Sequence, residues 1–328
     1  MSETVAEFMQ KPVKKYACGK KAQEAKKKLV KAFTASEKSK KVEENALFKK
    51  IVDSVMKTEK GRETLTSLSG FGYSFAFESG NFSGFCDADK KKIVINPHIS
   101  FPSMLQTAVH EGRHAIQYSL ERPDAPAAAL VQTASFLRFS RAIEADASAH
   151  EAAFAYECKD VIPEVYQDAE KQNFSMFRAY AGEMEKSGDE KKAMQASFAA
   201  WYECDSYRGF YDEWHKNDIK HFCDWGERQK YAGLFSKEYP AGDVLRMCVY
   251  DGKPYMTEDF LNTGKAFSVS VDGKKEISAM LRQYAAVVGD KPDTSLSAMR
   301  ERRADGTLLP EKKAVNAAVV AKAKREGR

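Results

Sequence analysis

The sequence has no long hydrophobic run. No stretch of eighteen apolar residues occurs among its 328 residues, and the charged N-terminal segment is not followed by the apolar stretch of a secretory signal peptide. These absences argue against a transmembrane helix and predict a cytoplasmic protein, although secretion without a cleavable signal would leave no trace in the sequence. With 43% hydrophobic residues, the chain can bury at least one large core.

Cysteine is sparse and scattered. The six cysteines form no C-x-x-C pair and have no tight spacing, which argues against both a structural zinc cage and a disulfide scaffold. We expect free thiols in a reducing compartment. The chain also has no internal repeat and no nucleic-acid-binding motif.

The net charge of +5 comes from the two ends of the chain. Residues 1–60 carry sixteen lysines against eight acidic residues, and residues 299–328 carry nine basic against four acidic residues. Such runs are most often solvated helix faces or loose tails, and an anionic partner such as nucleic acid or a lipid surface is the alternative. The middle of the chain is correspondingly acidic.

The apolar pattern predicts a predominantly helical α+β protein with one small sheet. Residues 22–66 have helical spacing, and residues 73–95 alternate and turn as two or three short antiparallel strands do. Two long helices should follow at about 101–120, capped by Ser100 or Ser103, and at about 127–158.

The helical pattern continues to about residue 226 and then weakens. The segments VLRMCVY and FSVSVDG resemble strands, and Thr257 is a candidate cap for a short helix at EDFLN. The Lys- and Ala-rich end reads as a fraying helix or a disordered tail.

The motif His110-Glu111-Gly112-Arg113-His114 is an H-E-x-x-H sequence. On a helix, residues i and i+4 point the same way, so two imidazoles can hold one metal ion with the glutamate beside it. At ~100° per residue, His114 lies ~40° from His110, whereas the apolar residues of this helix cluster on the opposite side. The pattern therefore predicts a core-facing apolar stripe and a metal-lined cleft on the other face.

A catalytic zinc needs a third protein ligand and an open position for water. The second long helix offers Glu144, which lies opposite Phe139 and Ile143, and Glu151, which shares its face two turns later. Glu144 follows His114 by thirty residues, which is enough for a loop and a returning helix. We expect Glu144 to be the third ligand and Glu151 to be the next candidate.

A strand, the sequence V-H-E-x-x-H-A and a helix containing E-A-D-A together resemble the gluzincin branch of zinc metallopeptidases. HEGRHAIQ is also similar to bacterial metallopeptidase families of unknown function. The resemblance covers residues 70–155 and implies a zincin-like core, in which His110, His114 and Glu144 bind zinc and Glu111 is the catalytic base. One departure is that several gluzincin families place the ligand glutamate where this chain has Ala142.

Several other residues are alternatives for the site. His150 lies on the Phe139 side of its helix, and Asp146 can hydrogen-bond it, so a core or supporting role is favoured over a ligand role. Cys86 would be the extra ligand of a deformylase-like hydrolase, although SGFCDA does not match that family's motif. Three histidines without ligand-like spacing are expected at the surface: His98, His215 and His221.

A peptidase of this type activates water with its metal, uses Glu111 as general base and acts on a peptide or protein substrate. The candidates for an oxyanion-stabilising residue come from a single aromatic stretch and are Tyr202, Tyr207, Arg208, Tyr211 and His215. A non-peptidase metallohydrolase and a helical interaction protein with a degenerate metal site are the alternative functions.

These patterns divide the chain into three parts. We expect a basic helical N-terminal extension at 1–66, a zincin-like metallopeptidase domain at 67–225, and a small C-terminal α/β region with a basic tail at 226–328.

Overall fold

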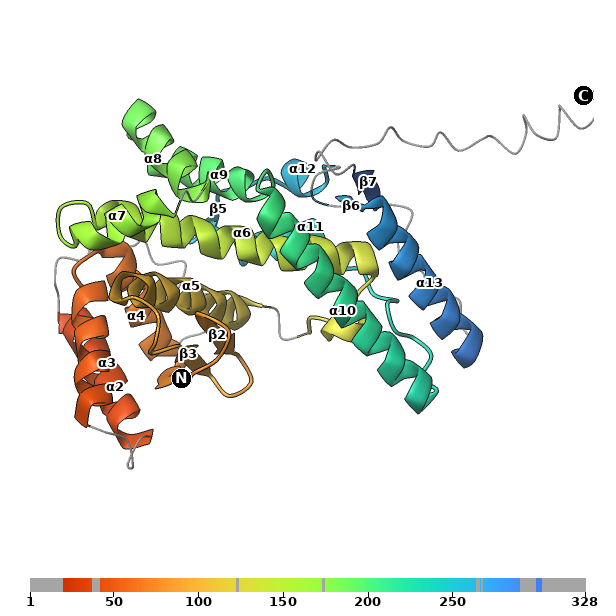
Figure 1. Cartoon of the computed structure of the whole chain (residues 1–328), viewed down its shortest axis with the longest axis horizontal. Coiled ribbons are helices and arrows are strands. Elements are labelled where there is room, and N and C mark those ends of the chain that lie inside the picture. The colour runs from red at the N-terminus through yellow and green to blue at the C-terminus, as the bar shows by residue number, and fades with distance from the viewer. Residues whose placement is uncertain are drawn as a thin grey trace, which may run out of the picture.

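The structure is a computed structural model. It describes residues 20–36, 42–121, 124–172, 175–263, 266, 268–289 and 299–302. Helices dominate this part of the chain, as the sequence predicts, and its three sheets are small (Figure 1). Residues 1–19 and 303–328, at the outer parts of the two basic ends, lie outside the described residues. The predicted contact with an anionic partner stays a prediction.

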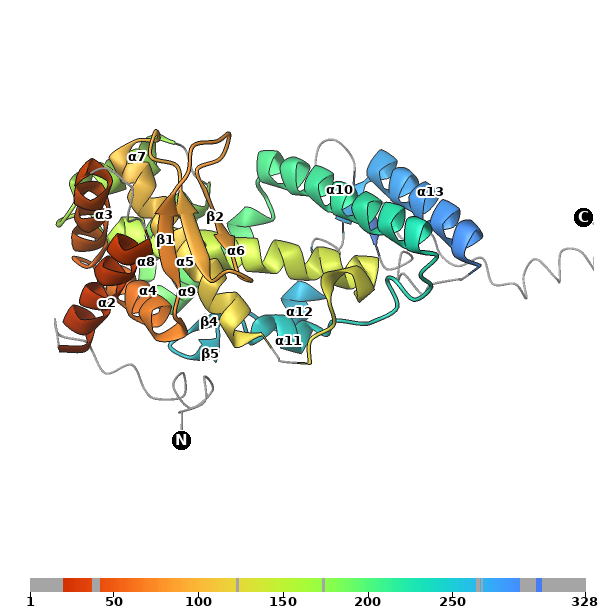
Figure 2. The ribbon, with the colours of Figure 1, turned by 90° about the horizontal axis from the view of Figure 1, so that it is seen from below.

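Two long helices form the centre of the molecule. α5 (Phe101–Leu120) begins where predicted, because the Ser100 side chain accepts a hydrogen bond from the Ser103 N–H at 3.2 Å and Pro102 lies in the first turn. α6 (Thr133–Glu157) follows the short 3-10 helix η1 (Ala128–Leu130). The two helices lie side by side in both views (Figures 1 and 2).

A three-stranded sheet packs against α5. It contains β1 (Ser74–Phe77), β2 (Gly84–Asp87) and β3 (Lys92–Ile95) in the order β1-β3-β2. β2 and β3 form the expected antiparallel hairpin, but β1 pairs with β3 in parallel, so the prediction of an entirely antiparallel sheet was wrong. The chain leaves β1, forms β2 at the far edge and returns through the middle of the sheet (Figure 2).

The helices before the sheet pack into the main core. They are α2 (Lys20–Ser36), α3 (Val42–Val55) and α4 (Glu59–Phe71). The Phe33 and Phe48 rings stack with centroids 4.1 Å apart, and Phe33 also meets Phe77 of β1 edge-on at 5.6 Å. The predicted amphipathic helices are thus present. The three-part division of the chain stays a prediction.

The four helices that follow α6 in the chain pack against it. They are α7 (Pro163–Lys171), α8 (Ser175–Ser187), α9 (Glu190–Trp201) and α10 (Asp205–Gln229). α10 crosses α6 and carries Asp212, whose carboxylate binds Arg141 of α6 through Oδ1 and Arg302 near the chain end through Oδ2.

The C-terminal part is more helical than predicted. It contains α11 (Ala241–Leu245), β4 (Val249–Tyr250), β5 (Lys253–Pro254), α12 (Glu258–Leu261), β6 (Ser268–Ser270), α13 (Val271–Val288) and β7 (Arg300–Arg302). Thr257 caps α12 as expected, because its side chain accepts from the Phe260 N–H. The two predicted strands shrink to β4 and β6, and α13, which the sequence analysis missed, begins directly after β6.

Among the described residues, no helix is both long and apolar enough to cross a membrane. The five described cysteines are free thiols, as the sequence predicts.

Candidate metal centre

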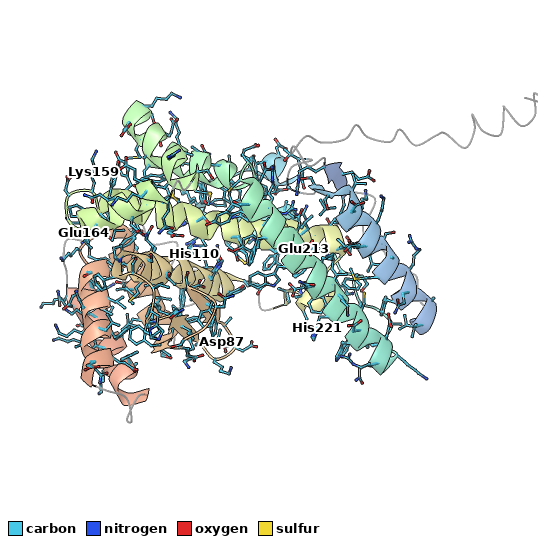
Figure 3. The ribbon with its side chains drawn as sticks, viewed as in Figure 1. Asp87, His110, Lys159, Glu164, Glu213 and His221 are labelled. Atoms are coloured by element: carbon cyan, nitrogen blue, oxygen red, sulfur yellow. The ribbon has the colours of Figure 1, made fainter. Side chains whose placement is uncertain are left out.

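Three side chains from α5 and α6 converge beside the contact between these helices. His110 and His114 lie one turn apart, with their Nε2 atoms separated by 3.2 Å. Glu144 of α6 approaches both, with Oε2 3.6 Å from His110 Nε2 and Oε1 3.5 Å from His114 Nε2. Figure 3 shows His110 on α5 facing α6. In the described part of the chain, these three residues form the one group of His, Cys, Asp and Glu side chains compact enough to hold a metal ion.

Hydrogen bonds to the Nδ1 atoms, which point away from Glu144 and are called the outer nitrogens below, fix the orientation of both imidazole rings. His110 Nδ1 lies 2.9 Å from Glu151 Oε2, and because a carboxylate only accepts, the imidazole donates there. His114 Nδ1 lies 2.8 Å from the side-chain oxygen of Gln117.

The orientation of the Gln117 amide is set by two further acceptors. Its nitrogen donates to the Ile143 carbonyl at 2.9 Å and to Asp146 Oδ2 at 2.7 Å, so its oxygen faces His114 and accepts. His114 therefore also carries its proton on Nδ1. In the neutral rings both Nε2 atoms then present lone pairs, which point toward each other and toward a carboxylate.

This donor set fits a metal ion. In these tautomers no proton lies between the two imidazole nitrogens and the carboxylate oxygen. All three atoms carry lone pairs, and a cation between them would stabilise the group. Outer hydrogen bonds from ligand imidazoles to a carboxylate and an amide oxygen are typical of protein metal sites.

The electrostatics of the group point the same way. Burial alone would lower the pKa of His110, but hydrogen bonds to Glu144 and Glu151 raise that pKa well above its usual value. Burial would raise the pKa of Glu144, yet the two histidines lower it far below the usual range. Without a metal, the carboxylates around these rings thus favour bound protons, which a metal ion would replace.

Glu111 lies beside the three donors and is half-buried. Burial raises the pKa of Glu111. The charges of His110 and His114 oppose this rise, and those of Glu144 and Glu151 reinforce it. Gly84 of β2 lies against this side chain, because a Cβ built on Gly84 would come within 3.4 Å of Glu111 Cγ. The absence of a side chain at Gly84 lets the edge strand approach the motif glutamate.

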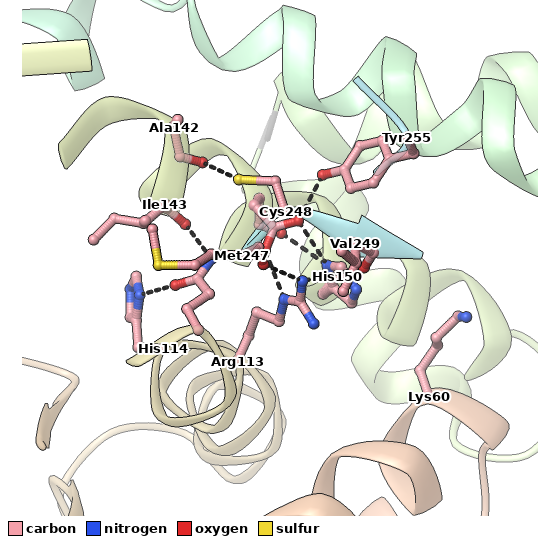
Figure 4. Close-up of polar contacts among 12 residues, drawn as sticks. Lys60, Arg113, His114, Ala142, Ile143, His150, Met247, Cys248, Val249 and Tyr255 are labelled. Carbon is pink, nitrogen blue, oxygen red and sulfur yellow. Dashed lines mark hydrogen bonds and ion pairs between the residues drawn. The ribbon is translucent and has the colours of Figure 1, made fainter. Parts of the chain in front are cut away.

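A buried polar network holds α5 and α6 in register beneath the site (Figure 4). Asp146 is fully buried and accepts from Arg113 Nε at 2.6 Å, from Gln117 and, at 2.9 Å, from the Tyr255 hydroxyl. Arg113 also donates to the carbonyls of Met247 and Val249, so the start of β4 and the residues just before it join the same network. A chain of hydrogen bonds thus connects His114 through Gln117 to a buried ion pair.

Of the five oxyanion candidates, Tyr211 contacts the donor group. Its hydroxyl donates to Glu144 Oε2 at 2.6 Å. Burial raises the pKa of Tyr207, and the nearby charges of Glu151 and Glu144 add to this rise. Arg208 instead donates to the Tyr202 carbonyl, away from the site. α10 therefore adds a hydroxyl to the wall of the site.

The other candidate ligands lie outside the donor group. Glu151 binds the outer nitrogen of His110, and His150 Nδ1 lies 3.0 Å from the Asp146 carbonyl. Burial, with the nearby Glu111, raises the pKa of Cys86 to about 12, so this thiol stays protonated. His98 and His221 are exposed as expected, but His215 is 3% exposed, so its surface prediction was wrong.

Sequence reasoning missed three supporting residues: Arg113, Gln117 and Tyr255. A signal existed for Gln117, because at ~100° per residue it lies ~20° from His110 on the histidine face. Tyr255 is 109 positions from Asp146, and no local pattern connects the two.

Comparison with known protein families gives independent evidence about the function of this site. Over residues 22–255 the chain matches the sequence model of the putative metallopeptidase family DUF6782. The chain belongs to this family. Membership in this metallopeptidase family indicates a hydrolase that uses a metal ion, and the matched region contains all three donors and ends at Tyr255. Neither the curated proteins nor the solved structures contained a match.

Proposed function

We propose that this member of the metallopeptidase family is a gluzincin-type zinc peptidase, with His110, His114 and Glu144 as ligands and Glu111 as general base. The observation that carries the proposal is the convergence of two imidazole Nε2 atoms on the Glu144 carboxylate while both Nδ1 atoms are held by acceptors. A cytoplasmic location stays a prediction of the sequence.

The donor types favour zinc. Zinc binds imidazole nitrogen and carboxylate oxygen, and its catalytic sites use three protein ligands with one position left for water. A site selective for calcium or magnesium would be built almost wholly from oxygen atoms. Two histidines among three donors therefore argue against those ions.

The chemistry follows from the residues around the donors. When bound, zinc acidifies a water molecule and polarises the scissile carbonyl. Glu111 accepts the proton of the attacking water as the water oxygen bonds to the carbonyl carbon, and passes that proton to the amine nitrogen as the C–N bond breaks. The Tyr211 hydroxyl donates its one proton to Glu144 Oε2 in this structure, and we assign it the hydrogen bond to the carbonyl oxygen when it turns from Glu144 to the substrate.

A peptide substrate fits the sheet beside the site. β2 is an edge strand among the described elements, pairing with β3 on one side, and Gly84 brings it against Glu111. An extended peptide could add to this edge through backbone hydrogen bonds, which would bring a peptide bond close to Glu111.

The first test measures metal content by elemental analysis of protein purified without added metal. We expect about one zinc per chain in the wild type, loss of zinc in His114→Ala and Glu144→Ala, and retention in Glu164→Ala, which removes an exposed glutamate of α7. Glu111→Gln should keep the zinc but lose cleavage of a peptide library.

Two results would redirect the proposal. A folded wild-type protein that neither contains nor takes up zinc would support the interaction-protein alternative. A zinc protein that cleaves no peptide in the library would support a different metallohydrolase.

A further inference from the structure

A small cavity lies directly beside the candidate metal centre. Its volume is about 140 Å³, and it lies between the end of α5, the first half of α6 and the first half of α10. Glu144 belongs both to the donor group and to the wall of this cavity. A substrate held at the metal centre would therefore have one side chain at the cavity.

Aromatic and aliphatic side chains form most of the wall. They come from all three helices and include Tyr118, Phe136, Phe139, Ile143 and Trp214. The Trp214 ring stacks on Tyr211 with an angle of 5° between the planes, which fixes one side of the cavity. Such a lining favours an apolar group because burial removes its surface from water.

The polar groups of the wall restrict the charge of the occupant. The carboxylates are Glu144 and Asp218, and the described residues of the wall include no lysine or arginine, so an acidic side chain is disfavoured. Burial, together with the nearby Arg141 charge, lowers the pKa of His215 to about 3, so this imidazole is neutral. Its ring nitrogens make no hydrogen bond of good geometry, although the Thr133 backbone lies close enough to affect its pKa.

A basic occupant is also less suitable. Asp218 already receives a hydrogen bond from the Trp214 side chain, and burial raises the pKa of this carboxyl, so it is a weak partner for a cation. A cavity of about 150 Å³ holds a benzene-sized group. The space therefore suits one compact apolar or aromatic side chain better than a long charged one.

The rim on α10 presents more aromatic surface. Phe210 and Trp214 are 61% and 50% exposed, and their rings meet edge-on at 5.9 Å. Large aromatic side chains exposed next to a cavity are typical of binding surfaces. This rim would contact the chain of a bound peptide next to the buried side chain.

We propose that the cavity between α5, α6 and α10 is a specificity pocket that receives one large apolar side chain, aromatic or branched aliphatic, of the peptide substrate. This inference rests on the proposed peptidase function for its biological role. The pocket itself can be tested without catalysis.

The binding test uses N-acetyl-phenylalanine amide, N-acetyl-arginine amide and N-acetyl-alanine amide as probes of the full-length protein. The indole NMR signal of Trp214, assigned with Trp214→Phe, should shift saturably with the phenylalanine probe and much less with the other two. Ser140→Leu, which fills the cavity from α6, should abolish the shift. Ala279→Leu adds the same side chain to an exposed position of α13 and should leave the shift intact.

The cleavage test compares peptides that differ at one position. We expect kcat/KM for phenylalanine or leucine to exceed that for alanine by about 10- to 100-fold. Ser140→Leu should reduce this ratio at least tenfold, and Ala279→Leu should not change it.

The outcomes separate the two proposals. Saturable binding of the phenylalanine probe without cleavage of any peptide would retain the pocket and overturn the peptidase function. Peptide cleavage with equal rates for phenylalanine, arginine and alanine, together with no selective shift of Trp214, would overturn the pocket. A preference for arginine that depends on Asp218 would also overturn it.

Discussion

At the residue scale, the candidate centre depends on which nitrogen of each imidazole carries the proton. Glu151 and Gln117 hold the outer nitrogens, so the inner nitrogens face Glu144 without rotating the rings. The conformational cost of orienting the ligands is thus met by the fold before any ion binds.

Replacing Glu151 with glutamine tests this support. We expect Glu151→Gln to weaken zinc binding about 10- to 100-fold, because the amide removes the charge that makes His110 a stronger ligand. Competition with a chelator of known affinity measures the effect. Glu164→Gln is the matched control, and equal affinities in the two variants would show that Glu151 has no supporting role.

The residues that sequence reasoning found share one property, which is that local spacing defines them. His110, Glu111 and His114 follow from a five-residue motif, and the structure brings them together with Glu144, although their roles stay predictions. Tyr211 was one of five equal candidates, because nothing in an aromatic stretch tells which hydroxyl faces a site on another helix.

At the element scale, close approach of backbones shapes the site. A Cβ at Gly84 would lie 2.5 Å from Thr107 Cγ2 of α5 and 2.5 Å from the Val94 carbonyl of β3. The carbonyl belongs to the sheet backbone and cannot rotate away, so β2 would have to move from its position beside Glu111.

Gly84→Ala should therefore lower the free energy of unfolding by about 1–3 kcal/mol through overpacking. It should also reduce kcat/KM, because β2 and Glu111 move relative to each other. Gly70→Ala is the control, since a Cβ there meets nothing within 4 Å and alanine favours the α4 helix. Chemical denaturation gives the stabilities, and equal stability of the two variants would contradict the close packing.

The buried pair between Arg113 and Asp146 is the second device at this scale. Arg113→Ala should cost about 3–5 kcal/mol, because it leaves a buried carboxylate without its charged partner. Lys90→Ala removes an exposed partner of Asp87 and should cost at most about 1 kcal/mol. Thermal and chemical unfolding of both variants measure the contrast, and similar losses would argue against the network.

Sequence patterns predicted most of the long elements well and the short ones poorly. α5 and α6 are long enough for caps and periodicity to define them, but four-residue strands carry no information about their neighbours, so the parallel pairing of β1 was missed. α13 has apolar residues at helical spacing, Ile277, Leu281 and Tyr284, but the alternating FSVSV before it suggested a strand.

At the scale of the whole molecule, one acidic cluster joins distant parts of the chain. Lys60 of α4 is 5% exposed and lies 2.8 Å from Glu190 of α9, and its backbone N–H donates to Glu157 at the end of α6. Burial raises the pKa of Glu157 from 4.5 to about 7, and the charges of Glu190 and Glu63 act in the same direction against Lys60.

This raised pKa predicts how stability changes with pH. Folding favours the protonated form of Glu157, so its contribution is fully present below pH ~4.5 and is lost as pH rises through ~7. Relative to Glu157→Gln, the wild type should lose on the order of 1–3 kcal/mol between pH 5 and pH 8.5. Denaturant titrations at both pH values test this, and a difference that does not vary with pH would refute it.

The attachment of α10 to α6 has a mechanical consequence. Arg141 and Glu144, one turn apart on α6, hold the adjacent residues Asp212 and Tyr211 of α10. A single contact would let α10 rotate about it relative to α6, whereas two contacts restrict that rotation. We therefore expect α10 to keep its position against α6 when a substrate binds. The substrate would then have to enter the site past the aromatic rim of Phe210 and Trp214.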